Sequence, residues 1–170
     1  MKFLIVDAFS EKLFGGNPAG IVILPKGSDF PSDELMVKTA AELRYSETAF
    51  ISIMNNNEFK IRYFTPAAEV DLCGHATVGA FCALAHLGII KKGDTCINHT
   101  LAGDLEVEVG SGYVMMDMAE PRELLTISDE ISLKELYDVL GTKYEKTTKL
   151  LPEMISTGLP DIMVPVSSKE

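Results

Sequence analysis

The sequence predicts an α+β fold in which an antiparallel-rich sheet curls around one central helix. Two observations carry this prediction. Short segments rich in Ile and Val recur along the chain between turn-forming residues, which is typical of a sheet with many short strands. One segment, at 75–88, is apolar on every side of the helical wheel rather than along a single stripe, so we expect the rest of the fold to enclose it.

The first half of the chain contains the clearest strand signals. "FLIVDAF" (3–9) and "AGIVILP" (19–25) are separated by the turn-forming "GGNP", so we expect two neighbouring strands. "SETAFISI" and "FKIRYFTP" follow further on and are joined by the polar segment "NNNE". This pattern predicts a β-hairpin.

A helix is predicted between these two strand pairs. "SDELMVKTAAELR" begins with Ser32 as N-cap and places acidic residues in the first turn, where they interact favourably with the helix dipole. Its apolar stripe is expected to face the sheet and consists of Leu35, Thr39 and Leu43. The apolar helix at 75–88 comes after the hairpin and ends at Gly88, a typical C-terminal stop.

Three strands are predicted after the apolar helix, from "TCINHT", "DLEVEV" and "YVMMDM". "SLKELYDVLG" then predicts a short helix with Ser132 and Glu135 as a capping box. "MISTGLPDIMVPV" (154–166) predicts two further strands and loosely repeats the pattern at the start of the chain. We therefore expect a first domain over residues 1–120, and over 121–170 a linker helix followed by the first strands of a second domain.

Composition restricts the possible functions. The 170 residues are 46% hydrophobic, enough for a core, and carry a formal net charge of −10. Because acidic and basic residues are scattered, no basic face is expected, and neither nucleic acid nor a membrane is an expected partner. No stretch has the length of a membrane span or the pattern of a signal peptide. The odd cysteine count fits reduced thiols in a cytoplasmic protein, at Cys73, Cys82 and Cys96.

The stretch "RYSETAFIS" places a carboxylate where an apolar side chain is expected. Side chains alternate between the two faces of a strand, so Glu47 shares a face with apolar neighbours. That face consists of Tyr45, Glu47, Ala49, Ile51 and Ile53. A carboxylate on a core-facing row is paired, neutralised or used for proton chemistry, because burial of an unpaired charge is costly. The alternative is a strand-end Glu that reaches solvent.

Polar residues gather at the entrance of the apolar helix, in "YFTPAAEVDLCGHATVGAFCALAHLG". They are Asp71, Cys73, Gly74, His75 and Thr77. The N-terminus of a helix offers free N–H groups and a partial positive charge, so this cluster is a candidate seat for a carboxylate or phosphate. The alternatives are that Asp71 merely caps the helix, that His75 is a partly exposed first-turn residue, and that Cys73 is a small core residue.

Four segments, in this order, resemble the PhzF family of phenazine-biosynthesis-like proteins: "MKFLIVDAFSEKLFGGNPAGIVIL", "ELRYSETAFI", "YFTPAAEVDLCGHATVGA" and "ISTGLPDIMVPV". The family is similar in fold to diaminopimelate epimerase and proline racemase. Those proteins have two domains of like topology, each a curled sheet around a central helix, with the active site in the cleft between them. The resemblance implies a diaminopimelate epimerase-like fold, with one complete domain and the start of a second in this chain.

The resemblance also implies roles for individual residues. Glu47, in the "S-E-T" motif, matches the family's acid/base residue, and His75, in "G-H-A-T", matches a residue beside the substrate. Cys73 is a further catalytic candidate, because the equivalent residue in diaminopimelate epimerase is a catalytic thiol. The candidate substrate-binding residues are Gly74, Ala76, Thr77 and Asn17. Neither a metal nor a cofactor is implied.

These residues suit an isomerase or epimerase that moves a proton on a small carboxylated metabolite, because such a reaction needs a carboxyl group that can give and accept a proton. A non-catalytic domain for carboxylate binding or dimerisation is the alternative. PhzF relatives continue through a second domain that supplies an Asp and a Gly-Ser-rich loop, so we expect a truncated chain with one wall of the site. An unfilled sheet edge then predicts a homodimer or larger self-association.

Overall fold

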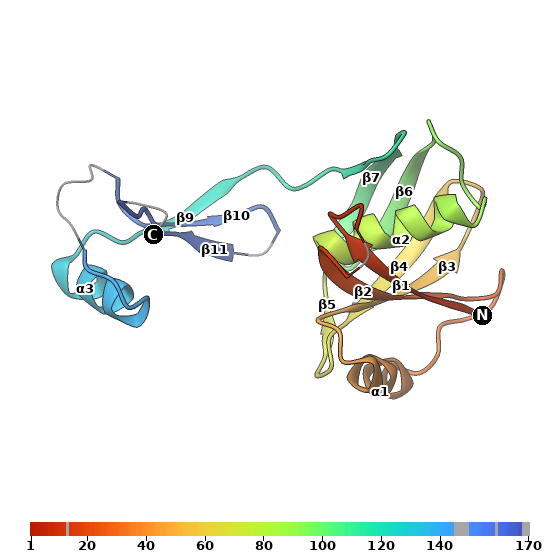
Figure 1. Ribbon diagram of the computed structural model, residues 1–170, viewed down its shortest axis with the longest axis horizontal. Helices are drawn as coiled ribbons and strands as arrows, with labels where there is room; N and C mark the ends of the chain where they lie inside the picture. The colour runs from red at the N-terminus through yellow and green to blue at the C-terminus, as the bar shows by residue number, and fades with distance from the viewer. Residues whose placement is uncertain (13, 145–149, 159, 168–170) are drawn as a thin grey trace. The chain divides into compact units, whose positions relative to one another are not determined.

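The computed structural model describes residues 1–12, 14–144, 150–158 and 160–167. The chain divides into two compact units, Met1–Asp117 and Met118–Glu170. Within the described ranges, the first unit contains an eight-stranded sheet and two helices, and the second contains a three-stranded sheet and one helix (Figure 1). None of these helices is long and apolar enough to cross a membrane.

The sheet of the first unit confirms the predicted fold class. Its strands lie in the order β1-β2-β3-β4-β6-β7-β8, and β5 pairs with β4 beside this path. Neighbouring strands are antiparallel except for the β2/β3 and β4/β6 pairs, which are parallel. The strands are β1 (Lys2–Ala8), β2 (Asn17–Ile23), β3 (Thr48–Ile53), β4 (Glu58–Phe64), β5 (Glu69–Val70), β6 (Thr95–Thr100), β7 (Gly103–Val109) and β8 (Val114–Met116). Both predicted strand pairs, β1/β2 and the β3/β4 hairpin, are present.

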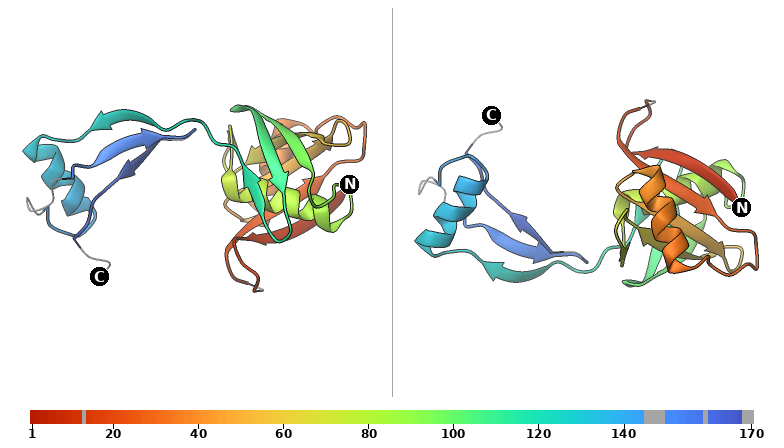
Figure 2. Two further views of the ribbon diagram at one scale, coloured as in Figure 1. Left: turned by 90° about the horizontal axis from the view of Figure 1, so that it is seen from above. Right: turned by 90° about the horizontal axis from the view of Figure 1, so that it is seen from below.

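The sheet curls around helix α2 (Gly74–His86), which is the predicted central helix (Figures 1 and 2). Residues of α2 form one apolar cluster with the inner face of the strands. Phe81 of α2 packs edge-on against Phe59 of β4, with 5.6 Å between the ring centroids. The fully buried members of this cluster include Ile21, Ile51, Ala76, Ala80 and Leu84.

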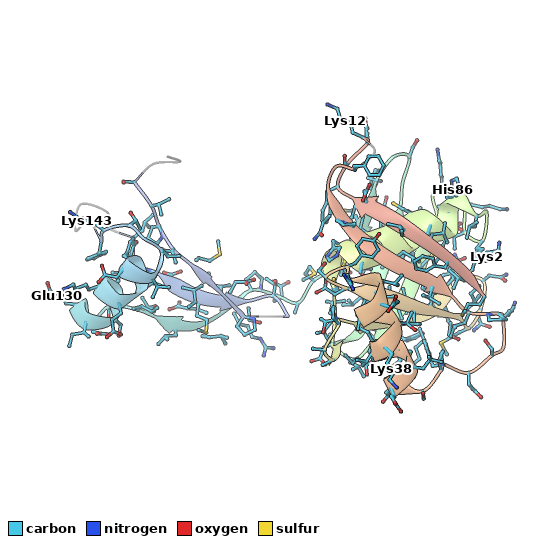
Figure 3. The ribbon with its side chains drawn as sticks, turned by 60° about the horizontal axis from the view of Figure 1, so that its bottom comes forward. Lys2, Lys12, Lys38, His86, Glu130 and Lys143 are labelled. Carbon is cyan, nitrogen blue, oxygen red and sulfur yellow. The ribbon has the colours of Figure 1, made fainter. Side chains whose placement is uncertain are left out.

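The expectation that α2 is enclosed on every side is wrong along one stripe. Cys82 and His86 are exposed, and Val78 is only half-buried; His86 lies at the surface near the end of the helix (Figure 3). The reason is that β1 and β8, the end strands of the sheet, both pack on α2 but do not pair with each other in the described residues. A pocket of about 340 Å³ opens there, lined by parts of β1, α2 and β8.

Helix α1 (Asp33–Leu43) covers the opposite face of the sheet. Ser32 caps it as predicted, because its side chain accepts a hydrogen bond from the Leu35 N–H. The predicted buried stripe is wrong: Leu35 is 54% exposed, whereas Met36 and Ala40 are fully buried. Met36 and Ala40 are four residues apart, and the small Ala40 lets the helix approach the sheet closely, so this face packs against the outward-facing aromatic rings of the strands.

The second unit contains β9 (Arg122–Thr126), α3 (Glu130–Val139), β10 (Glu153–Ser156) and β11 (Pro160–Met163), with the strands in the order β11-β10-β9. The last two strands were predicted and β9 was not, because its charged and exposed residues do not alternate with apolar ones. The predicted capping box of α3 is wrong. The N-cap is Asp129, whose carboxylate accepts a hydrogen bond from the Ser132 N–H at 2.9 Å, so the helix begins before Ser132.

Candidate functional site

Glu47 lies directly before β3 and keeps the register that its sequence predicts. Its backbone carbonyl accepts a hydrogen bond from the Gly20 N–H at 3.2 Å, which continues the parallel pairing of β2 and β3. Ala49 and Ile51, two and four residues further on, are fully buried against α2. The Glu47 side chain therefore lies on the α2 side of the sheet, and it is 20% exposed. The expectation of a partly buried carboxylate is confirmed.

The first residues of α2 face Glu47. Cys73 is the N-cap residue, with an extended backbone, and its side chain does not cap the helix. Asp71 is exposed and lies two residues before this N-cap, so the alternative that Asp71 caps the helix is wrong. The cluster at the helix start therefore consists of a thiol and an imidazole, from Cys73 and His75.

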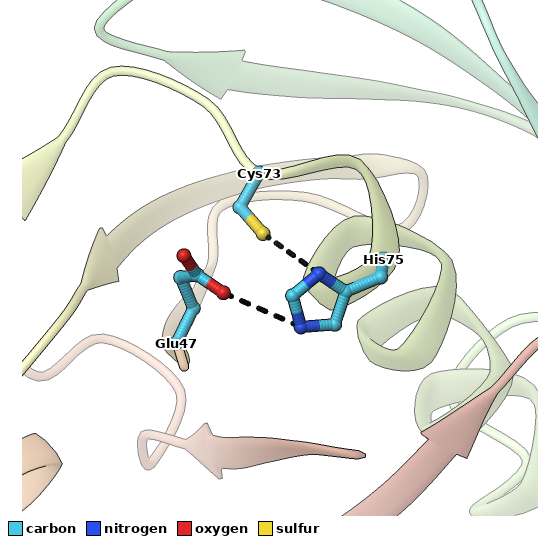
Figure 4. A group of neighbouring side chains, drawn as sticks. All are labelled: Glu47, Cys73 and His75. Carbon is cyan, nitrogen blue, oxygen red and sulfur yellow. Dashed lines mark hydrogen bonds and ion pairs between the residues drawn. The ribbon is translucent and has the colours of Figure 1, made fainter. Parts of the chain in front are cut away.

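His75 contacts both Glu47 and Cys73, one through each ring nitrogen (Figure 4). Its Nε2 is 3.4 Å from Glu47 Oε2 and 3.3 Å from Ser46 Oγ, and its Nδ1 is 3.2 Å from Cys73 Sγ. The His75 side chain is 10% exposed. One ring nitrogen thus contacts a carboxylate and the other a thiol. The tautomer of His75 decides whether the neutral ring donates its hydrogen bond to Glu47 or to Cys73.

The surroundings keep the Cys73 thiol protonated. Burial, together with the negative charge of Glu47 and a side-chain hydrogen bond with Glu47, raises the pKa of Cys73 to about 12. The backbone N–H groups of Ala76 and His75 act in the opposite direction, since they stabilise a thiolate, but burial outweighs them. Cys73 is therefore a neutral hydrogen-bonding group near neutral pH.

A buried chain of hydrogen bonds ends at the Cys73 carbonyl and so holds the start of α2 in place. Asn98 Nδ2 donates to the Tyr63 hydroxyl at 2.9 Å, and the Tyr63 and Thr77 hydroxyls are 2.6 Å apart. Thr77 Oγ1 in turn donates to the Cys73 carbonyl at 2.7 Å. Thr77 is fully buried, so the structure places it behind the site rather than on its open side.

The other predicted binding residues lie on different sides of the cluster. Gly74 is exposed, and a Cβ atom added to it would meet no other atom within 4 Å, so its open side is free for a ligand. Ala76 is fully buried, and its backbone N–H lowers the pKa of Cys73. Asn17 is exposed at the start of β2, and no hydrogen bond links it to Glu47 or His75 in the described structure.

Three residues of this arrangement were missed by sequence reasoning: Ser46, Tyr63 and Asn98. Ser46 directly precedes Glu47 in the same motif, so its place beside His75 could have been found from the motif alone. Tyr63 and Asn98 carry no local signal, because they belong to different strands and meet only through the β4/β6 pairing.

The fold of this chain is shared with a probable proline racemase from Agrobacterium radiobacter, with a TM-score of 0.54 over 96% of this chain and 52% of the other, at 13% identity. A family model described as phenazine biosynthesis-like protein, PhzC-PhzF, matches residues 6–170. The chain belongs to this family.

Two relatives show how much of the family's length the chain covers. An uncharacterised isomerase, YfhB, from Bacillus subtilis is 36% identical over 99% of this chain and 57% of its own length. A PhzF-family phenazine biosynthesis protein from Bacillus anthracis has a crystal structure that matches with a TM-score of 0.81 at 31% identity. That match covers 98% of this chain and 57% of the other. The chain therefore spans little more than half the length of these relatives.

Proposed function

We propose that this chain carries the acid/base side of an isomerase or epimerase that moves a proton on a small carboxylated metabolite. The observation that carries the proposal is the position of Glu47, a half-buried carboxylate 3.4 Å from His75 Nε2 and beside the N-terminus of α2. The names of the relatives, an isomerase and a phenazine biosynthesis protein, support it. Free thiols at all three cysteines support a reducing compartment such as the cytoplasm.

Each group has a role that its position allows. Glu47 takes the proton from one carbon of the substrate and returns it to another, because a carboxyl group in a partly apolar setting can do both. The first N–H groups of α2, around Gly74, hold the substrate carboxylate with the help of the helix dipole. His75 and Ser46 orient the Glu47 carboxylate, and Cys73 holds the imidazole from the other side.

The test is deuterium exchange into a carboxylated substrate in D2O. Dihydro-hydroxyanthranilate is a suitable probe, since it is a cyclic carboxylate with an exchangeable carbon-bound proton. We expect weak binding and slow exchange, because Glu47 is 20% exposed and water competes with the substrate at an open site. Glu47→Gln should reduce exchange by about 10²-fold or more, since the amide cannot transfer the proton.

Glu42→Gln is the matched control, because Glu42 is an exposed carboxylate on α1, outside the candidate site. It should exchange at the wild-type rate. Exchange that continues unchanged in Glu47→Gln would contradict the role of Glu47. Carboxylate binding without exchange, even over days and with a range of cyclic and acyclic carboxylates, would favour a non-catalytic binding domain.

We also propose that copies of this chain associate through the sheet edges. Both β1 and β8 have one hydrogen-bonded neighbour in the described residues, so each leaves a row of backbone groups available for another strand. Apolar side chains on these strands are exposed: Phe3 by 47%, Ile5 by 53% and Met115 by 57%. A homodimer or larger assembly would cover them.

A further inference from the structure

The side chains of Glu47, Cys73 and His75 offer three different ligand types in one place. One carboxylate oxygen, the thiol sulfur and one imidazole nitrogen all lie within 4.8 Å of one another. Carboxylate, thiolate and imidazole are the three side-chain groups that bind Zn²⁺ in proteins. The side chains of Glu47 and His75 are 20% and 10% exposed and Cys73 is 9% exposed, so an ion would reach the thiol past the other two groups.

The spacing of these groups is close to that of a metal site. Zn–S and Zn–N bonds of about 2.3 and 2.0 Å at a tetrahedral angle separate the two ligand atoms by about 3.5 Å. The sulfur of Cys73 is 3.2 Å from His75 Nδ1. The carboxylate of Glu47 contacts the other ring nitrogen of His75, and one of its oxygens also lies within 4.8 Å of the ligand atoms of Cys73 and His75.

The charge of Glu47 is not balanced by a permanent cation. In the part of the chain that the structure describes, its ion-pair partner is His75, which is positive only when protonated. The Lys and Arg side chains with ion pairs, Lys38 and Arg62, bind other carboxylates. A divalent cation would balance this carboxylate, and it would displace the proton of the Cys73 thiol on binding, as metal ions do when they bind cysteine.

The backbone holds all three residues in place before any ion binds. Cys73 and His75 belong to the N-cap and first turn of α2, and the Cys73 carbonyl is held by the Thr77 hydroxyl at 2.7 Å. Glu47 is held by the hydrogen bond from the Gly20 N–H to its carbonyl. Preorganisation of this kind lowers the cost of assembling a metal site.

We propose that Glu47, Cys73 and His75 form a binding site for a thiophilic divalent cation, Zn²⁺ in particular, with a fourth position open to solvent. Three protein ligands with one open position are the arrangement of accessible zinc sites. The ion and a proton-transferring Glu47 exclude one another, because both use the same carboxylate. That last consequence rests on the proposed function, whereas the binding site itself does not.

The test is a titration of the full chain with Co²⁺ and then Zn²⁺. Co²⁺ bound to a thiolate gives a charge-transfer band in the near ultraviolet, and Zn²⁺ should displace it because nitrogen and sulfur sites bind Zn²⁺ more tightly than Co²⁺. Cys73→Ser should abolish the band. It should also weaken Zn²⁺ binding by about 10- to 100-fold or more, measured by competition with a chelator.

Cys82→Ser is the matched control, because Cys82 is an exposed thiol on the same helix. His86 lies four residues further along, so a surface site at Cys82 and His86 is the competing explanation of a cobalt band. The band should remain unchanged in Cys82→Ser. Glu47→Gln should keep the band but weaken Zn²⁺ binding, and circular dichroism should show that each variant is folded.

Two results would overturn the proposal: a wild-type chain without a charge-transfer band, or a band that is lost in Cys82→Ser and kept in Cys73→Ser. The titration reads the metal directly and does not measure proton exchange. A chain that binds Zn²⁺ through Cys73 but exchanges no substrate proton when it is free of metal would therefore disprove the proposed function and leave the metal site supported.

Discussion

Gly74 lies between the two residues whose side chains contact each other at the start of α2. A Cβ atom at this position would meet no neighbour, so Gly74→Ala fits the folded chain. Since Ala is the better helix former, the variant should be more stable by up to about 1 kcal/mol. The new methyl group projects into the open space at the helix start, so carboxylate binding should weaken by about tenfold or more.

Chemical denaturation and a ligand titration followed by NMR would measure these two effects. The combination is diagnostic, because a purely structural glycine gives a less stable chain when it is replaced. A variant that binds carboxylates as well as the wild type would show that ligands do not approach over Gly74.

Cys73 and Cys82 should differ in their reaction with iodoacetamide, because alkylation requires the thiolate. The pKa of Cys73 is raised to about 12, so this thiol should react much more slowly at pH 9 than the exposed Cys82, whose pKa is also raised by partial burial. Glu47 raises the pKa of Cys73 through its charge and its hydrogen bond. Glu47→Gln should therefore lower the pKa of Cys73 and accelerate its alkylation, which mass spectrometry of the separated peptides would follow.

The reaction rate of Cys82 should not respond to Glu47→Gln, so Cys82 serves as an internal control. Equal rates for Cys73 in the wild type and Glu47→Gln would contradict the contact between Glu47 and the thiol.

At the residue scale, the place of Glu47 could be predicted because it follows from the period of a strand. Ala49 and Ile51 define the inner face, and a residue two positions earlier must share it. The contact between His75 and Cys73 could also be foreseen from their spacing at a helix start. The depth of Thr77 could not, because it depends on Tyr63, whose hydroxyl comes from another part of the chain.

At the scale of elements, the hydrogen bonds of Tyr63 connect β4, β6 and α2. Tyr63→Phe leaves Asn98 Nδ2 and the Thr77 hydroxyl without this buried partner. The unfolding free energy at pH 7 should therefore fall by about 1–3 kcal/mol. Because the Cys73 carbonyl is held by Thr77, carboxylate binding at the start of α2 should weaken as well.

Tyr63 also makes the folded chain less stable at alkaline pH. Burial raises the pKa of Tyr63 to about 12, above the value of about 10 for an unfolded tyrosine. The unfolded chain thus loses this proton first as the pH rises, so the contribution to stability is complete below about pH 10 and is lost towards pH 12. Cys73, with its raised pKa, acts in the same direction.

Urea denaturation at pH 7, 9, 10 and 11 would measure this decline. It should be shallower in Tyr63→Phe than in the wild type, whereas Tyr45→Phe, outside this chain of hydrogen bonds, should follow the wild type. If the unfolding free energy falls equally steeply with pH in Tyr63→Phe and the wild type, another group causes the loss of stability at alkaline pH.

The elements that sequence reasoning predicted well are those with strong local signals. Ser32 caps α1 as expected, but for α3 the sequence offers both Asp129 and Ser132, and only the backbone geometry chooses Asp129. The buried face of α1 depends on how closely Ala40 lets the helix approach the sheet. The spacing of apolar residues in the sequence does not reveal this distance. The open stripe on α2 depends on which strands are sheet edges, a property of topology.

At the scale of the whole molecule, the exposed edge of β1 predicts association. Size-exclusion chromatography with light scattering should give a dimer or a larger species. Ile5→Lys should shift the chain towards monomer, because a charged side chain on an edge strand opposes strand addition. Leu35→Lys is the control, since Leu35 is equally exposed but lies on α1. A wild-type chain that is monomeric at all concentrations would contradict the edge proposal.

The parallel pairing of β2 with β3 has a consequence for the order in which the chain folds. The β1/β2 and β3/β4 pairs form between segments that are close in sequence, whereas β2 and β3 meet only after the connection that contains α1 has closed. Contacts across such a connection form late, because the entropy of loop closure opposes them until many contacts form together. Glu47 is held by Gly20 across this pair. We therefore expect that Glu47 is not yet positioned in partly folded chains in which only the hairpins have formed. The candidate site should form in the last step of folding.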